Sequence, residues 1–227
     1  MLSAVAIIPS PPVMVPELAA AAAGELSDLR EAVFTAAASL PIRWIAVGVG
    51  SADAVLGPES VGTFAGYGVD VRVTLSPDAA GAPTELPLCA LIAGWVRGQA
   101  KPDARAEARV YAADLAAEAA VDCGRRLRAE LDEAADPVGV LVVADGAHTL
   151  TPTAPGGYEP DSIPAQAALD DALTAGDAAT LTRLPDAIVG RVAYQVLAGL
   201  APSSRSAMEL YRGAPFGVGY FAGVWTP

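Results

Sequence analysis

The sequence predicts a single α/β domain in which a central, mostly parallel or mixed β-sheet is flanked by helices on both faces. The chain has 227 residues, which fits one large domain with a sizeable core, and no repeat, low-complexity tail or flexible linker divides it. Apolar residues make up 53% of the chain and charged residues only 18%, as expected of a well-packed domain. Short aliphatic runs alternate with longer helical patterns, and this order builds βαβ units.

The N-terminal part of the chain predicts a strand, a helix and a second strand. Ser3–Ile8 is a short apolar run closed by Pro9, and the two prolines that follow Ser10 forbid a helix there. A helix is expected from Pro16 to Leu40, because proline suits the first helical position. The apolar positions that keep close to a helical period within it are Leu18, Ala22, Leu26, Leu29, Val33 and Phe34. Arg43–Gly50, RWIAVGVG, follows as a strand apolar enough to be buried on both faces.

The remaining elements are expected to alternate in the same way. Further strands are expected at residues 69–75, 138–144, 207–211 and 218–225. Further helices are expected at residues 88–99, 115–131, 164–175, 177–184 and 188–200. Segments rich in glycine and proline predict loops at residues 57–68, 76–87 and 151–164. Residues 107–113 remain ambiguous, because Val110 and Tyr111 favour a strand and the neighbouring alanines favour a helix.

The charge and the cysteines exclude several classes of protein. The net charge of −12 repels phosphate backbones and anionic lipid surfaces, which argues against nucleic acid and membranes as partners. The first apolar run stops at Pro9, too early for a secretory signal or a membrane span, so we expect a cytoplasmic protein. Cys89 and Cys123 lack CxxC spacing, which favours buried free thiols over a disulfide or a zinc site.

The stretch LVVADGAHTLTP, residues 141–152, contains the main candidate site. The expected strand breaks at Asp145 and leads to His148, the only histidine of the chain. Ser10 and Ser51 follow two other expected strands, so parallel pairing would gather these four side chains at one edge of the sheet. Asp145 could orient the His148 imidazole or raise its pKa, and His148 is the natural group for proton transfer. A purely structural role for a lone histidine in a loop is the alternative.

Other chemistries find partial support in the residues present. Ser10, His148 and Asp145 could form a hydrolase site, although no GxSxG elbow surrounds the serine. The glycines of residues 48–51 lack the GxGxxG pattern and the lysine of phosphate-binding loops. One histidine cannot supply the two-histidine, one-carboxylate set of Fe(II) oxygenases. The acids available for oxygen-only binding of a hard cation are Asp145, Glu159 and Asp161.

Five stretches in order carry a resemblance that covers nearly the whole chain. They are IIPSPP, RWIAVGVG, VVADGAHTL, VGRVAYQVLAGLAP and ELYRGAPFGVGYFAGVW. In this order they resemble the class III extradiol ring-cleavage dioxygenases, and more narrowly the alanine-rich, actinobacterial subunit-B-like members and the Memo-like proteins. The resemblance implies a class III extradiol dioxygenase-like fold over residues 1–227. It also places His148 at the family's acid/base histidine.

The resemblance implies an Fe(II) cofactor whose ligands this chain lacks. Ser10 stands where the first metal histidine is expected, and Gly50 and Ser51, with Asp53 nearby, stand where the second is expected. Near the third ligand position the chain has Val189, and the next polar candidate is Gln195.

We therefore expect a dioxygenase-like protein without Fe(II) and without ring-cleaving activity. A residual cleft around Ser10, Ser51, Asp145, His148 and the Tyr158 loop would bind a small molecule or a protein partner, and assembly into homo-oligomers is open. The alternatives are an active extradiol dioxygenase with unrecognised ligands, and the Ser10 hydrolase.

Overall fold

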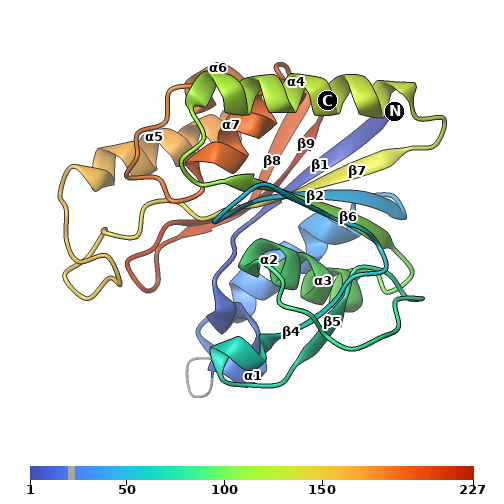
Figure 1. The fold of residues 1–227 in the computed structure, drawn as a ribbon. Helices are drawn as coiled ribbons and strands as arrows, with labels where there is room; N and C mark the ends of the chain where they lie inside the picture. Colours follow the sequence, from blue (N-terminus) through green and yellow to red (C-terminus); the bar gives the residue numbers. More distant parts are fainter. Residues whose placement is uncertain (20–23) are drawn as a thin grey trace.

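The computed structural model describes residues 1–19 and 24–227, and within them seven strands form one mixed sheet. These strands are β1 (Leu2–Ile8), β2 (Arg43–Gly50), β3 (Ala54–Leu56), β6 (Arg105–Ala112), β7 (Val138–Val143), β8 (Ser206–Gly213) and β9 (Tyr220–Thr226). Their order across the sheet is β3-β6-β2-β7-β1-β9-β8 (Figure 1). The four central strands β6, β2, β7 and β1 are parallel, whereas β3, β9 and β8 are antiparallel to their neighbours. The predicted single α/β domain with a mixed sheet is confirmed.

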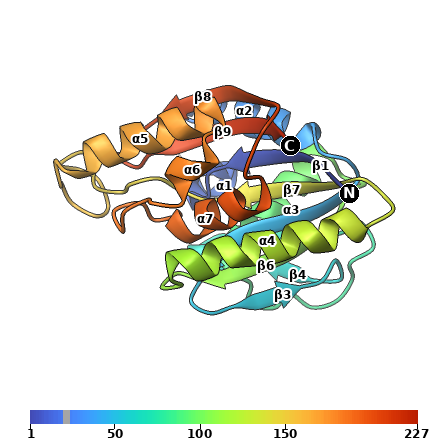
Figure 2. The same cartoon turned by 90° about the horizontal axis from the view of Figure 1, so that it is seen from above.

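Helices cover both faces of the sheet, as the sequence predicts (Figures 1 and 2). The helices are α1 (Pro16–Ala19), α2 (Ser27–Ala38), α3 (Leu88–Ala100), α4 (Ala117–Glu133), α5 (Ser162–Ala175), α6 (Ala178–Leu181) and α7 (Arg191–Leu200). Successive residues of a strand point to opposite faces. Ala6 and Ile8 of β1 therefore pack with α2 and α3, whereas Val5 and Ile7 pack with α4, α5 and α7. All six residues of β7 are buried, which explains its continuous aliphatic sequence.

The connections diverge at the carboxyl end of the sheet. The chain leaves β1 and β2 toward α2 and α3 on one face, and it leaves β7 toward α5, α6 and α7 on the other face. β7 lies between β1 and β2. The carboxyl end of β7 is therefore a topological switch point, the place where doubly wound α/β proteins form their binding sites.

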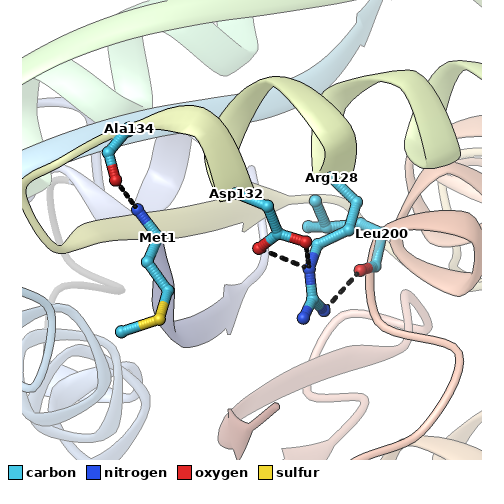
Figure 3. A network of polar contacts seen from close by, with 5 residues as sticks. All are labelled: Met1, Arg128, Asp132, Ala134 and Leu200. Carbon is cyan, nitrogen blue, oxygen red and sulfur yellow. Dashed lines mark hydrogen bonds and ion pairs between the residues drawn. The ribbon is translucent and has the colours of Figure 1, made fainter.

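Two glycines let α4 and α7 approach closely. A Cβ added at Gly124 of α4 would lie 2.0 Å from the carbonyl oxygen of Val196, and one at Gly199 of α7 would lie 2.0 Å from that of Val121. Figure 3 shows the end of this contact, where Arg128 of α4 donates to the Leu200 carbonyl at 3.3 Å. A cation at a helix C-terminus is favourable, because the last carbonyls carry a partial negative charge.

The figure also shows how neighbouring groups fix the ends of these elements. Asp132 holds the Arg128 side chain in place, since Arg128 Nε donates to both carboxylate oxygens at 2.9 and 3.0 Å. The N-terminal amine of Met1 donates to the carbonyl of Ala134, directly after α4, at 2.8 Å (Figure 3).

Several sequence expectations are wrong in detail. The continuous helix expected from Pro16 to Leu40 is two helices, because residues 24–26 form turns before α2 begins at Ser27. Ala22, expected on its apolar face, lies outside the described residues. The helix expected from residue 188 begins at Arg191, and the one expected over 177–184 is the single turn of α6. Residues 107–112 of the ambiguous segment belong to strand β6, and Ala113 is in the turn that follows.

The largest error concerns residues 57–75. The expected strand over 69–75 reduces to β5 (Arg72–Thr74), and the expected loop before it contains β4 (Val61–Thr63) and the 3-10 helix η3 (Phe64–Tyr67). β4 and β5 form a separate two-stranded sheet. The buried Arg97 of α3 explains this placement, because its Nε donates to the Thr74 carbonyl at 2.9 Å and so holds β5 against the helix.

Two further expectations, on membrane spans and on the cysteines, can be compared with the described residues. None of their helices is long and apolar enough to cross a membrane. Both cysteines are free thiols, as the sequence predicts. Cys89 is buried as expected, whereas Cys123 is only partly buried.

Candidate functional site

Ser10 and Asp145 form a hydrogen-bonded pair at the switch point. The register of β1 and β7 pairs Ile8 with Val143, and continuing it by two residues places Ser10 beside Asp145. The Ser10 hydroxyl donates to Asp145 Oδ2 at 2.8 Å, and the Ser10 backbone N–H donates to Asp145 Oδ1 at 2.7 Å. The sequence prediction that these two residues share one edge is therefore confirmed.

The environment of Asp145 disfavours its charge. Burial raises the pKa of the carboxyl from 3.8 to about 6, although the two hydrogen bonds from Ser10 lower it. Charge-assisted hydrogen bonds favour the ionised form, whereas removal from water disfavours it, and here the second effect is larger. Asp145 can therefore hold or release a proton close to neutral pH.

The backbone that carries Asp145 is fixed from several sides. The Gly190 N–H donates to the Asp145 carbonyl at 2.8 Å, and the Gly146 N–H donates to the Gly219 carbonyl at 2.8 Å. The Ala147 N–H donates at 2.7 Å to the side-chain oxygen of the buried Gln166. A Cβ at Gly146 would lie 2.0 Å from that same oxygen, so this turn requires glycine. These hydrogen bonds fix the backbone after β7 and therefore the direction in which the Asp145 side chain points.

His148 does not join the Ser10–Asp145 pair. The residue is exposed, and its ring lies against Gly156, where an added Cβ would be 2.4 Å from His148 Cδ2. Within residues 1–19 and 24–227 no hydrogen bond involves the imidazole, and both carboxylate oxygens of Asp145 accept from Ser10. The expected pairing of Asp145 with His148 is absent because the intervening turn is fixed with the carboxylate facing β1.

Ser51 and Tyr158 form no hydrogen bond with the pair among the described residues. Ser51 follows β2 and is exposed. Tyr158 is 49% exposed, and its backbone pairs with Leu150 in an isolated bridge. No hydrogen bond among the described residues connects either side chain to Ser10 or Asp145. Of the five sequence-predicted site residues, Ser10 and Asp145 are the two that hydrogen bonds join within the described chain.

Two tyrosines near Asp145 were not singled out by the sequence. Tyr220 begins β9 directly after Gly219, whose backbone is hydrogen-bonded to Gly146 and Ala147. Burial raises the pKa of Tyr220, and the nearby Asp145 charge raises it further. Tyr194 of α7 is fully buried and donates its hydroxyl to the Ala144 carbonyl at 2.8 Å. Burial, with the Asp145 charge, also raises the pKa of Tyr194.

The residues at the expected Fe(II) positions do not fit a metal. Ser10 donates its hydroxyl to Asp145, Val189 is 49% exposed and apolar, and the Gln195 amide oxygen accepts from Arg191 at 3.3 Å. Across the described part of the chain, no three His, Cys, Asp or Glu side chains gather as a metal would require. Neither the Fe(II) set nor the oxygen-only site of Asp145, Glu159 and Asp161 is assembled.

Comparison with known proteins supports the fold and not an activity. No protein-family model matches the chain, and no curated protein matches its sequence. A solved structure of the uncharacterized protein JW3007 from Escherichia coli K12 is similar, with a TM-score of 0.62. The match covers 99% of this chain and 100% of that one at 12% sequence identity. The likeness is one of fold.

Proposed function

We propose that this protein has a dioxygenase-like fold without ring-cleaving activity and that it binds a small molecule at the Ser10–Asp145 pair. The observation that carries the proposal is the double hydrogen bond between these residues at the switch point. Serine stands where the resemblance expects a metal histidine, and its donors are directed to a carboxylate. A hydroxyl that donates to a carboxylate is a poor ligand for Fe(II), which prefers imidazole and carboxylate ligands in such sites.

The chemistry of the pair indicates which ligands would suit it. Each carboxylate oxygen of Asp145 accepts one hydrogen bond from Ser10 and has a further lone pair. The Tyr220 phenol is close enough to Asp145 for the carboxylate charge to raise its pKa, and it can donate or accept a hydrogen bond. We propose a small ligand with hydroxyl groups, which would donate to Asp145 and exchange hydrogen bonds with Tyr220.

Metal loading and catechol turnover test the loss of dioxygenase activity. The full-length protein would be incubated with Fe(II) without oxygen, desalted, analysed for metal and then assayed for oxygen uptake with catechol. We expect iron far below one equivalent and no catechol-dependent uptake. Stoichiometric iron together with ring cleavage would overturn the proposal and support an active dioxygenase with other ligands.

Binding of catechol in the absence of oxygen tests the site itself, with tryptophan fluorescence or protein NMR as the readout. We expect catechol to bind the unmodified protein. Ser10→Ala should weaken this binding by about tenfold, because the Ser10 hydroxyl no longer orients the Asp145 carboxylate that accepts from the ligand. Ser203→Ala, at an exposed serine elsewhere, is the matched control and should bind as the unmodified protein does. Equal binding by all three proteins would place the ligand elsewhere, and absence of binding by the unmodified protein would contradict the proposed ligand class.

A second candidate function is acyl transfer at Ser10. The observation that favours it is the 2.8 Å contact from the Ser10 hydroxyl to Asp145, since a carboxylate with a raised pKa is a stronger base. This hydrolase would use Asp145 directly and would not need His148. A fluorophosphonate probe should then label Ser10 in the His148→Ala variant as in the unmodified protein. Absence of labelling in both proteins would contradict this candidate.

A further inference from the structure

A cavity lies beside the edge of the sheet, and neither Ser10 nor Asp145 lines it. It has a volume of about 550 Å³, within the range of small-molecule sites. Its floor is formed by β3 and β6, and its wall by α4. The residues that line it are Asp53, Ala54, Val55, Arg109, Val110, Tyr111, Cys123, Arg126, Leu127 and Glu130.

The cavity exists because α4 is drawn toward α7. The glycine contacts described above bring these two helices together over the middle of the sheet. In the view from above, β3 lies on the outer side of α4, at the edge of the sheet next to β6 (Figure 2). Val55 of β3 is 63% exposed as a consequence, an apolar side chain open to the cavity.

The cationic groups of this cavity differ in how they are neutralised. Arg109 forms ion pairs with Glu107 and with Glu130, the second at 2.7 Å, so its charge is compensated twice. Arg126 donates to the Cys123 sulfur at 3.0 Å, and among the described residues it has no carboxylate partner. The lining therefore holds two arginines and two carboxylates, and among the described residues Arg126 is the guanidinium of the lining without an ion-pair partner.

The other polar groups of the cavity, Asp53 and Tyr111, restrict which ligands can bind beside Arg126. Asp53 accepts from the Ala112 N–H at 2.7 Å, which fixes this carboxylate at the rim. The Tyr111 hydroxyl has no hydrogen bond within the described chain, and burial raises its pKa to about 12, so it remains a neutral donor. Val55 and Leu127 supply apolar surface nearby.

We infer that this cavity binds a small monocarboxylate with an apolar body. The carboxylate would pair with Arg126 and accept from Tyr111, and the apolar body would lie against Val55 and Leu127. Guanidinium and carboxylate groups match in charge and in planar shape. One guanidinium without an ion-pair partner fits one negative charge, whereas a phosphate dianion would meet stronger repulsion from Asp53 and Glu130 without a second such cation.

Cys123 gives this inference a local readout. It lines the cavity, and the only other cysteine, Cys89, is buried with its pKa raised to about 11 by that burial. A bound ligand should shield Cys123 from iodoacetamide, while Cys89 reports on any general unfolding. The measured quantity is the ratio of Cys123 alkylation rates without and with benzoate, determined by mass spectrometry within each variant.

The matched variants are Arg126→Gln and Arg125→Gln, which change the charge equally on neighbouring positions of α4. Arg125 is exposed, pairs with Asp122 at 2.7 Å and does not line the cavity. We expect benzoate to slow alkylation in the unmodified protein and in Arg125→Gln. In Arg126→Gln the benzoate concentration for half protection should rise at least about tenfold, because a charged hydrogen-bonding partner is lost.

Three outcomes would overturn the inference. They are absence of protection by benzoate in the unmodified protein, equal protection in Arg126→Gln, and equal protection by benzamide, which has the same shape without the charge. Phosphate at the same ionic strength should protect less than benzoate, and equal protection would show a site for anions in general and contradict the apolar contact.

Discussion

Replacement of Asp145 by asparagine should change how the stability of the protein depends on pH. Asp145 is partly buried, and its carboxyl accepts two hydrogen bonds from Ser10. Burial nevertheless raises its pKa from 3.8 to about 6. The fold therefore prefers the protonated form more strongly than the unfolded chain does, and asparagine removes this titration.

The sign and size of the effect follow from where the proton is bound. Below about pH 3.8 the Asp145 carboxyl is protonated in both states. Between about pH 3.8 and 6 only the folded state holds the proton, so the free energy of unfolding falls as pH rises. Above about pH 6 the fold carries the whole cost of the ionised carboxylate. At about 1.4 kcal/mol for each pH unit, this cost is about 3 kcal/mol.

Urea unfolding followed by fluorescence of the three buried tryptophans, at a series of pH values, measures this dependence. The free energy of unfolding of the unmodified protein minus that of Asp145→Asn should fall by about 3 kcal/mol from pH 3.5 to 7. Loss of the Ser10 hydrogen bonds adds an offset that does not vary with pH. Asp177→Asn is a control of opposite sign, because hydrogen bonds from Thr180 lower the pKa of Asp177. The ionised Asp177 therefore stabilises the fold at neutral pH, and this stabilisation is lost as pH falls through its pKa. A difference for Asp145→Asn that stays constant or rises with pH would refute the dominance of burial.

Three further substitutions test the packing and the placement of the lone histidine. Gly199→Ala should lower the free energy of unfolding by roughly 1–3 kcal/mol or more, because its Cβ would lie 2.0 Å from the Val121 carbonyl oxygen. Gly98→Ala is the control, because Gly98 also lies within a helix and no atom lies within 4 Å of the added Cβ. This substitution should raise the free energy of unfolding by about 0.5–1 kcal/mol. If urea unfolding showed a change of the same sign for Gly199→Ala and Gly98→Ala, the close contact between α4 and α7 would be contradicted. His148→Ala should change the free energy of unfolding by no more than about 0.5 kcal/mol, since the residue is exposed, and a larger loss would show that the ring makes stabilising contacts.

The central elements could be predicted from the sequence because burial on both sheet faces leaves a local signal. The aliphatic run of β7 is such a case, because all six of its residues are buried. Residues 72–74 show where this signal is insufficient. Their alternation is that of a strand, but an arginine 23 residues further along the chain fixes them on α3, and a contact so distant in sequence has no local pattern.

The candidate site could be predicted only in part for the same reason. Strand ends are visible in the sequence, and parallel pairing then brings Ser10 and Asp145 together. Proximity along the chain misleads for His148, because the direction of a side chain depends on the turn before it. Tyr220 is absent from the prediction because its position depends on β9 pairing with β1, which no sequence pattern specifies.

The energetic cost of Asp145 is itself an argument for a binding role. A residue that served only to join β1 to β7 would be expected to stabilise the fold, yet the raised pKa means that the ionised carboxylate opposes folding at neutral pH. Burial of a charge with a perturbed pKa is common where a protein binds or transforms a ligand. The switch point supplies the location, and the ligand's own donors would complete the hydrogen bonding of the carboxylate. If Asp145→Asn weakened catechol binding while leaving stability at pH 7 equal or higher, the pair would be a binding site and not a structural clamp.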